Sequence, residues 1–272
     1  MANLTGLTIY PVKGCRRVEL EGSHVERRGL RYDRRWMVVD STWLFMSQRS
    51  NSRLAKLRAV VVNDRMRLSG PDIEPIDLPY GNADGPLADV TVWKNVVTAR
   101  VAPSKVNNWI SEFLDQECSL VFMAEDSIRP VDPNFVAKPD DSVSFADGYP
   151  VLLATEASLA DLNSRLSSPI PMTRFRPNLV IAGTEPFEED RWKTVHIGEV
   201  RFRVAKACGR CLVTTLDPES GQSTGNEPLK TLGEFRQFDG KANFATNLIP
   251  LNPGNISVGE DLVVEEYVLT RT

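Results

Sequence analysis

The sequence predicts a mainly β protein with a few helices, in the α+β class. Most apolar segments alternate with polar residues or are rich in β-branched and aromatic residues. Only a few stretches carry apolar residues at helical spacing. The strands also recur at regular intervals, which suggests closure into a barrel.

The first half is expected to hold strands followed by one helix. Residues 90–93 and 96–102 are predicted to pair through a turn at Lys94-Asn95. Residues 103–116 carry apolar side chains at helical spacing, with Ser104 as the expected N-cap. The other predicted strands cover residues 4–12, 34–40, 43–47, 54–62 and 65–70.

A polar stretch with three prolines, residues 124–143, divides the chain. It is expected to connect an N-terminal β-rich domain, 1–123, to a second domain, 144–272. In the second domain a helix is predicted to start after Thr155, its N-cap, and a shorter helix is predicted to open near residues 226–228. The predicted strands there cover residues 178–183, 195–206, 211–216 and 256–269.

Composition excludes several classes of protein. The 272-residue chain has a net charge of −4, which argues against a nucleic-acid or anionic-membrane partner. The N-terminus lacks the pattern of a secretory signal, and no apolar run approaches the ~20 residues of a membrane helix. Four cysteines in a chain of this length do not form a disulfide framework. We therefore expect a cytoplasmic protein, with a monomer as the simplest state.

Two of the cysteines, Cys208 and Cys211, form a C-x-x-C motif without a second pair. A structural zinc site needs four ligands, and the two histidines, His24 and His196, are distant and outside any ligand motif. A thioredoxin-like pair should open a helix, whereas 211–216 is rich in β-formers and is predicted to continue as a strand. Nothing local supports a Cys–His nucleophile pair.

One thiolate beside a cation remains as a functional interpretation of this motif. Arg210 is expected to lower the pKa of a neighbouring thiol, and the thiolate is the form that binds soft metals. The alternative is that both cysteines are small buried residues at the end of a strand. The motif alone leaves the two interpretations open.

Cationic residues gather at predicted strand ends, where loops build binding sites. They include Lys13 beside Gly14, Arg34 beside Arg35, and Arg49 near Ser47. Arg174 and Arg176 are expected on one side of an extended segment, because Pro177 biases Arg176 to an extended conformation. Arginine forks suit phosphate or another oxyanion, although each arginine alone is more simply a surface charge. Asp147, in an Asp-Gly pair, is either a turn residue or a carboxylate at a polar site.

Together these residues resemble a known family. The segments YPVKGC, LRYDRRWMVVD, SFADGYPVLLATEASLADLNSRL, TRFRPNLVIAG, EEDRWKTVHIGEV and CGRCLVTTLDPESGQSTGNEPLKTL are similar to MOSC proteins with an N-terminal β-barrel-type domain. The relatives it resembles are the mitochondrial amidoxime reducing components and the bacterial YcbX-like proteins. The resemblance implies a MOSC β-barrel after an N-terminal β-rich domain, and it covers nearly the whole chain.

The resemblance implies molybdenum cofactor, in which a pterin carrying a phosphate holds molybdenum through a dithiolene. By the motif, Cys211 is the protein ligand of the metal and Cys208 is an expendable neighbour. The remaining positions that match the family's cofactor site, with Asp147 also expected near the reaction, are Lys13, Gly14, Arg34, Arg49, Asp147, Gly148, Tyr149, Arg176, Asn178, Gly209 and Arg210.

Two positions depart from the family pattern. Gly14 stands where the family often has serine, and Gly209 replaces the serine of C-S-R-C. Each change removes a hydroxyl group, and a backbone N–H can replace it.

The resemblance implies a reductase of N-hydroxylated compounds such as amidoximes, hydroxylamines and N-hydroxylated bases. No four further cysteines with plant-type spacing follow, so no fused iron–sulfur cluster is expected. Electrons would then come from a separate protein of the ferredoxin, flavodoxin or flavin reductase type. The alternatives are a non-catalytic carrier of molybdenum cofactor and a sulfur-transfer protein that uses a persulfide on Cys211.

Overall fold

The computed structural model describes residues 1–81, 85–136 and 138–268, and its fold is mainly β, as predicted. The strands in the first half are β1 (Asn3–Ile9), β2 (Val18–Glu19), β3 (Gly22–Glu26), β4 (Gly29–Leu30), β5 (Trp36–Asp40), β6 (Arg58–Val62), β7 (Arg65–Gly70), β8 (Ile73–Pro79), β9 (Leu87–Val92), β10 (Asn95–Val101) and β11 (Cys118–Phe122). Those in the second half are β12 (Val151–Thr155), β13 (Leu179–Ala182), β14 (Trp192–Ile197), β15 (Val200–Gly209), β16 (Gln237–Phe238), β17 (Lys241–Pro250), β18 (Gly254–Ser257) and β19 (Leu262–Tyr267). The α-helices are α1 (Ser104–Leu114), α2 (Glu156–Arg165) and α3 (Leu229–Phe235), and the short 3-10 helices are η1 (Ser52–Lys56), η2 (Met172–Phe175), η3 (Glu188–Arg191) and η4 (Leu212–Thr215).

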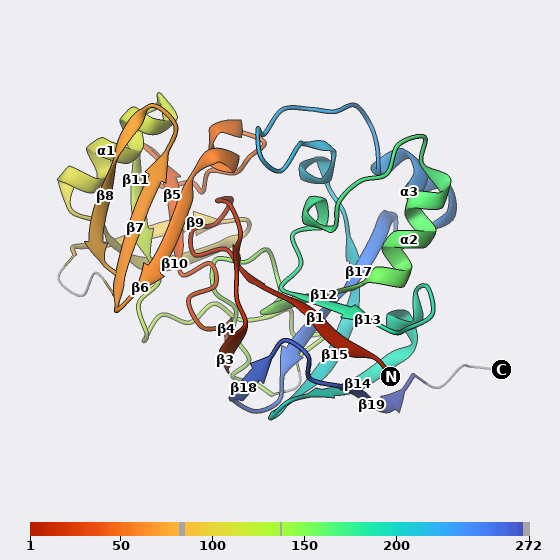
Figure 1. The fold of residues 1–272 in the computed structure, drawn as a ribbon. Coiled ribbons are helices and arrows are strands. Elements are labelled where there is room, and N and C mark those ends of the chain that lie inside the picture. The colour runs from red at the N-terminus through yellow and green to blue at the C-terminus, as the bar shows by residue number, and fades with distance from the viewer. Residues whose placement is uncertain (82–84, 137, 269–272) are drawn as a thin grey trace.

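The largest sheet runs in the order β19-β14-β15-β17-β12-β13-β1-β2. The sheet closes on itself, because Asn3 at the start of β1 bridges Asp261 just before β19. The Leu4 N–H donates to the Glu260 carbonyl at 2.8 Å, and the Leu262 N–H donates to the Ala2 carbonyl at 2.9 Å. The predicted barrel-like closure is thus confirmed for this sheet. Helices α2 and α3 cover it on one side, at the right of Figure 1.

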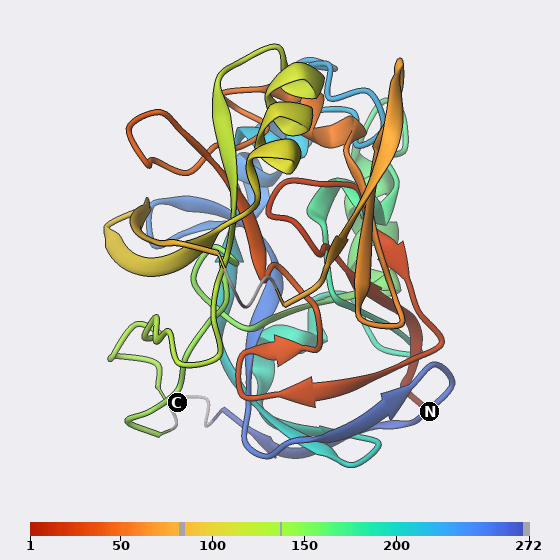
Figure 2. The same ribbon diagram turned by 90° about the vertical axis from the view of Figure 1, so that its left-hand side faces the viewer.

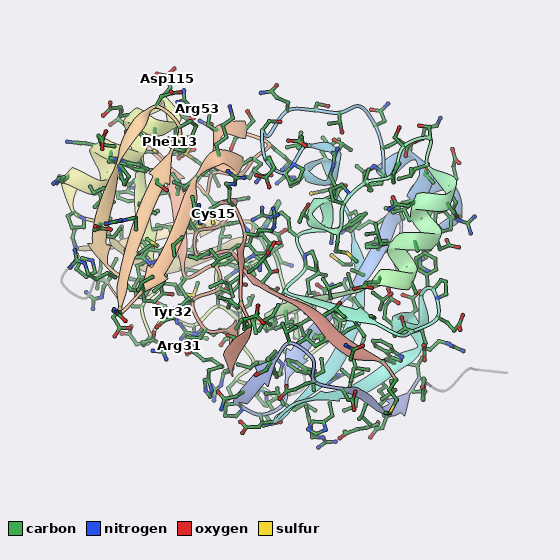
Figure 3. All side chains as sticks on the ribbon, viewed as in Figure 1. Cys15, Arg31, Tyr32, Arg53, Phe113 and Asp115 are labelled. Atoms are coloured by element: carbon green, nitrogen blue, oxygen red, sulfur yellow. The ribbon has the colours of Figure 1, made fainter. Side chains whose placement is uncertain are left out.

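The first half forms two smaller sheets, β5-β11-β10-β9 and β6-β7-β8. Helix α1 packs against β8 and β11 at the end of the molecule that faces the viewer in Figure 2. Within this packing the Arg53 guanidinium of η1 lies 5.6 Å from the ring of buried Phe113, and both are labelled in Figure 3. The cluster of buried apolar residues here is separate from the cluster inside the barrel.

The division of the chain into domains at 123 and 144 remains a prediction. Strand pairing crosses it, because β1 pairs with β13 and β3 pairs with β18. The connecting segment also takes part in packing, since Val131 and Val143 are buried beside Ile249 of β17. The first and second halves are therefore joined by sheet and core contacts.

Several local predictions are confirmed. Thr155 caps α2, with its hydroxyl accepting from the Ser158 N–H at 3.2 Å. Helix α3 begins close to the predicted position. The β9–β10 hairpin forms, but its turn lies at Trp93-Lys94, one residue earlier than predicted, and Trp93 adopts a φ of 56°.

Other local predictions are wrong at their boundaries. Residues 52–56 form η1, capped by the Asn51 side chain, so the predicted strand at 54–62 begins only at Arg58. Residues 43–47 make isolated bridges rather than a strand. Pro103, not Ser104, is the N-cap of α1. At residues 52–56 the turn capped by Asn51 competes with the extended form that the residue types favour.

Candidate functional site

A pocket of about 140 Å³ lies where the two halves meet. It is built from the loops after β1 and β5, from those before β5, β12 and β13, from the end of β15 with the turn that follows it, and from strands β12 and β17. Of the residues predicted for the cofactor site, the pocket brings together Lys13, Gly14, Arg34, Asp147, Gly148, Tyr149, Arg176, Asn178, Arg210 and Cys211. Arg49 and Gly209 are not among its lining residues.

The Cys211 segment is not the predicted strand. β15 ends at Gly209, and η4 begins directly after Cys211. The hydroxyls of Thr214 and Thr215 donate to the carbonyls of Cys211 and Leu212 at 2.9 and 2.8 Å. These local bonds favour a short turn over the extended form that β-branched residues prefer. This single turn is also shorter than the helix that a thioredoxin-like motif opens.

The four cysteines differ in access. Cys211 is exposed, Cys208 is half-buried, Cys15 and Cys118 are buried, and all four are free thiols. Burial raises the pKa of Cys15 to about 11, although the charges of Arg176 and Arg34 and a hydrogen bond from Val12 oppose the shift. Cys211 is therefore the thiol that a metal in the pocket reaches most easily.

Arg210 is directed toward Cys208. Its Nη1 lies 2.9 Å from the Cys208 sulfur, and its Nη2 donates to the Phe175 carbonyl at 2.7 Å. Its backbone N–H donates to the Ala242 carbonyl of β17 at 2.7 Å. Arg210, the cation expected beside the Cys211 thiol, is thus held against the neighbouring thiol of Cys208, which also lines the pocket.

Arg34 and Arg176 lie on the same aromatic ring. Their guanidinium carbons are 4.4 and 4.0 Å from the centroid of the buried Tyr10 ring. Arg176 Nη2 also donates to the Cys15 carbonyl at 2.9 Å. Two guanidinium groups at one wall of the pocket can bind the oxygens of an anion with paired N–H donors.

Both arginines have left-handed backbones, with φ of 50° at Arg34 and 54° at Arg176. The extended conformation predicted for Arg176 from Pro177 is therefore wrong. Arg176 ends η2, and its N–H donates to the Thr173 carbonyl at 3.2 Å, which favours the left-handed form. Such backbones cost about 1 kcal/mol or more and cluster at functional sites. Arg174, two residues earlier, does not line the pocket and donates to the Thr224 hydroxyl instead.

Asn178 links the segments that form one wall of the pocket by hydrogen bonds. Its Oδ1 accepts from Arg34 Nη1 at 3.2 Å and from the Leu152 N–H at 3.1 Å. Its Nδ2 donates to the Thr8 carbonyl at 3.0 Å, and the residue is only 1% exposed. With its amide groups used inside the protein, Asn178 positions Arg34 and joins β1 to β12.

Lys13 and Asp147 form an ion pair across the two halves. Lys13 Nζ donates to Asp147 Oδ1 at 2.6 Å and to the Phe145 carbonyl at 2.8 Å. Burial lowers the pKa of Lys13, partly opposed by the Asp147 charge. For Asp147 desolvation raises the pKa, but the charge and hydrogen bond of Lys13 and the charge of Arg34 outweigh it and hold the pKa well below its usual range. Asp147 is therefore a carboxylate at neutral pH.

The Asp147 loop is held by a residue that sequence reasoning missed. Arg129, from the connecting segment, is buried and donates to the carbonyls of Ser144, Ala146 and Asp147. Burial lowers the pKa of Arg129 to about 10. Its position in a proline-rich stretch gave no signal of this role.

Arg49 and Gly209 lie just outside the pocket. The Arg49 guanidinium carbon is 4.8 Å from the Trp93 ring, and Trp93 in turn donates to Asp147. A side chain at Gly209 would place its Cβ 2.5 Å from Cδ of Lys241, so a serine requires Lys241 to move. Gly14 has a φ of +86°, where serine is strained, and Gln48 Nε2 donates to its carbonyl at 2.7 Å. Glycine thus fits the backbone conformation at position 14 and the packing of the Lys241 side chain at position 209.

Further lining residues were not predicted as site residues. Gln48 and Phe175 lie within segments that the sequence did point to, while Leu152 and Asn247 line the pocket from sheet strands. The full set is Ser47, Gln48, Ala146, Leu152, Phe175, Cys208, Val213, Thr214 and Asn247. Most of these residues lie in loops and short 3-10 turns that the fold brings together, so spacing along the sequence does not reveal them.

The chemistry of the pocket suits an anion that carries a soft metal. Among the described residues, Lys13, Arg34, Arg176 and Arg210 line it with one carboxylate, Asp147. The buried Tyr149 hydroxyl and Arg210 Nε have no hydrogen-bond partner there. Within the same residues no group of three or more His, Cys, Asp or Glu side chains could hold a metal ion. A metal at Cys211 therefore needs further ligands from a cofactor.

Two family models match the chain. The MOSC N-terminal beta barrel domain matches residues 1–117, and the MOSC domain matches residues 140–263. In the part of the chain that the structure describes, none of the helices is long and apolar enough to span a membrane.

Curated relatives match most of the chain. Mitochondrial amidoxime-reducing component 1 of Danio rerio is 35% identical over 88% of this chain and 76% of its own. The human component 1 is 34% identical over 93% and 80%, and the human component 2 is 30% identical over 90% and 76%. The cytoplasmic location expected from the sequence is contradicted by these relatives, which are named as mitochondrial proteins.

Proposed function

This chain belongs to the family of MOSC-domain proteins that includes the mitochondrial amidoxime-reducing components, and on that premise we propose its function. It is a molybdenum-cofactor-dependent reductase of N-hydroxylated compounds: amidoximes, hydroxylamines and N-hydroxylated bases. The observation that carries this proposal is the exposed Cys211 thiol in a pocket lined by one lysine and three arginines.

The residues present fit molybdenum cofactor. The accessible thiol of Cys211 supplies one soft ligand, and the pterin dithiolene would supply the others that the described residues lack. Arg34 and Arg176, paired on Tyr10, suit the cofactor phosphate because their forks present several N–H donors. Tyr149 and Arg210 offer buried donors without partners to the polar edge of the pterin.

When bound, the cofactor supplies the two-electron chemistry that converts an N–O bond into N–H, with two protons taken up and one water released. The protein's own residues bind and orient. Cys211 holds the metal, and Asn178 fixes the direction of Arg34 through Oδ1. Lys13 keeps Asp147 ionised, so Asp147 accepts hydrogen bonds from the substrate and does not donate a proton.

The electrons come from a separate protein of the ferredoxin, flavodoxin or flavin reductase type. No group of cysteines near the pocket, in the residues that the structure describes, could hold an iron–sulfur cluster of its own.

Reduction of benzamidoxime to benzamidine, with dithionite-reduced methyl viologen as electron source, tests the proposal. Cofactor-loaded wild-type protein should turn over, and Cys211→Ser should lose activity at least about a hundredfold, because a hard hydroxyl is a poor substitute for a thiolate. Wild-type activity retained in Cys211→Ser would refute the assignment. Bound cofactor without turnover would indicate the carrier function instead.

A further inference from the structure

The tip of the β9–β10 hairpin brings an aromatic side chain to the edge of the pocket. The indole Nε1 of Trp93 donates to Asp147 Oδ1 at 3.3 Å. Trp93 is 41% exposed and is not itself a lining residue of the pocket, whereas Asp147 is. The indole therefore stands beside Asp147 on its outer side, on the first half of the chain, while Asp147 belongs to the second.

Trp93 is held in place from several directions. The Phe45 ring lies 4.7 Å from it between centroids, and the Arg49 guanidinium carbon lies 4.8 Å from its centroid. The segment carrying Phe45 is fixed to the hairpin by the bond from the Phe45 N–H to the Thr91 carbonyl, at 2.9 Å. Lys13 Nζ also lies 5.8 Å from the centroid of this ring. The part of the fixed ring that Arg49 and Lys13 leave exposed offers an apolar surface to a ligand at little entropic cost.

Asp147 keeps one oxygen available. Its Oδ1 accepts from Lys13 and from Trp93, while no described residue donates to Oδ2. The Asp147 side chain is 74% exposed. A carboxylate oxygen in this position accepts from an N–H or O–H group of a bound molecule.

We propose that Trp93 and Asp147 select the substrate: the indole binds a flat conjugated group, and Asp147 Oδ2 accepts from an N–H next to the N–OH group. This inference rests on the proposed function and narrows its substrate class to planar, N–H-bearing N-hydroxy compounds, of which aryl amidoximes are the simplest. Trp93 binds the substrate away from the reacting atoms, so it should affect KM more than kcat.

The test uses cofactor-loaded protein and isothermal titration calorimetry without a reductant, so that no turnover occurs. Two probes form a matched pair: benzamidoxime, and N,N-dimethylbenzamidoxime, which lacks the N–H donors. Wild-type protein should bind benzamidoxime about tenfold more tightly, the factor that one charge-assisted hydrogen bond supplies. Equal affinity for the two probes would overturn the role of Asp147 Oδ2.

Trp93→Ala should weaken the binding of both probes about tenfold. Trp43→Ala is the matched control, because Trp43 is a similarly exposed tryptophan, at 38%, with no contact to Asp147. Trp93→Phe keeps a flat ring and should retain most of the affinity, which separates loss of the ring from a folding defect. Unchanged binding in Trp93→Ala with a normal melting temperature would overturn the proposal.

The same variants distinguish this inference from the proposed function. With methyl viologen as donor, Trp93→Ala should raise KM for benzamidoxime about tenfold and leave kcat within about twofold. If wild-type protein turns over but Trp93→Ala has an unchanged KM, only the substrate-selection role fails. If wild-type protein binds benzamidoxime but never reduces it, the reductase function fails while selection stands.

Discussion

Individual side chains at the pocket owe their behaviour to partners from the other half of the chain. Asp147 stays ionised because Lys13, which follows β1, donates to it at 2.6 Å. Arg34 Nη1 donates to its neighbour Asp33 and also to Asn178, which lies 144 residues later. Residue types could be predicted as a set of cations around Cys211, but these pairings depend on the fold. The sequence therefore indicated which residues belong to the site, but it did not indicate which partner each of them contacts.

The solvent exposure of the four thiols predicts the order in which an alkylating reagent modifies them. In cofactor-free protein at pH 8, iodoacetamide should modify Cys211 first, because it is the exposed thiol. Cys15 and Cys118 should react only on unfolding, since burial excludes the reagent and raises the pKa of both. Peptide mass mapping over time checks this order. Modification of Cys15 before Cys211 would show that the segment after β1 opens in solution.

Substitution of the two arginines of the R-F-R-P motif should affect cofactor retention differently. Arg176→Ala should lower cofactor retention about tenfold or more, because a guanidinium–phosphate contact contributes roughly 1.5–3 kcal/mol. Arg174→Ala is the control, since Arg174 donates to Thr224 and does not line the pocket. Pterin fluorescence after oxidative release measures retention. Equal loss in both variants would indicate a general effect on η2.

At the scale of elements, turns and buried strands were the hardest to predict. β17 was missed although nearly all its residues are buried, because its sequence, KANFATNLIP, does not alternate. The segment after Cys211 was predicted as a strand because its residues are β-branched, yet threonine hydroxyls bonded to nearby carbonyls make it a 3-10 turn. Amphipathic elements such as α1 and α2 were predicted well, since one exposed face gives them a clear period.

Because β17 lies in the middle of the large sheet, we predict that truncating one of its buried side chains strongly destabilises the protein. Phe244 is fully buried, and its ring stacks on Phe175 with centroids 3.9 Å apart. Phe244→Ala should lower the free energy of unfolding by about 3–5 kcal/mol. Phe238→Ala, at a 39% exposed position of β16, should change it by less than about 1 kcal/mol. Urea denaturation measures both, and similar losses would contradict the assignment of β17 to the core.

Glu189 of η3, which contacts the start of α2, should make the stability of the fold depend on pH. It is buried and accepts from the Ser158 and Thr155 hydroxyls. Burial raises its pKa to about 7, with the hydrogen bonds opposing. The protonated form is favoured in the folded state, so its stability contribution is complete below about pH 4.3, the ordinary value for glutamate, and is lost as pH rises through 7.

Stability should therefore fall by roughly 1–3 kcal/mol between pH 5 and pH 8 on account of Glu189. Glu189→Gln should remove this part of the dependence, because glutamine stays neutral. Melting temperatures of both proteins across that range test the sign. A wild-type protein that gains stability relative to Glu189→Gln on going to pH 8 would contradict the account.

At the scale of the whole molecule, the site exists because the chain closes on itself. The start of β1 meets residues before β19, and the segments that follow β1 and precede β5 then face the Asp147 and Cys211 loops. The sequence predicted a mainly β fold with barrel-like closure, and the resemblance named the family. The sequence did not predict that Arg129 would hold the Asp147 loop or that Trp93 would donate to Asp147, because neither lies in a segment with a chemical motif.

The central claim is that Cys211 holds molybdenum in this pocket. Its most direct test is metal analysis of protein purified from a host that makes the cofactor, with Cys211→Ala and, as the matched control, Cys208→Ala. The account predicts about one molybdenum per chain in wild-type protein, none in Cys211→Ala, and substantial metal in Cys208→Ala, because a thiolate is the protein ligand that soft metals prefer. Wild-type protein without molybdenum, or Cys211→Ala with a full complement, would contradict it.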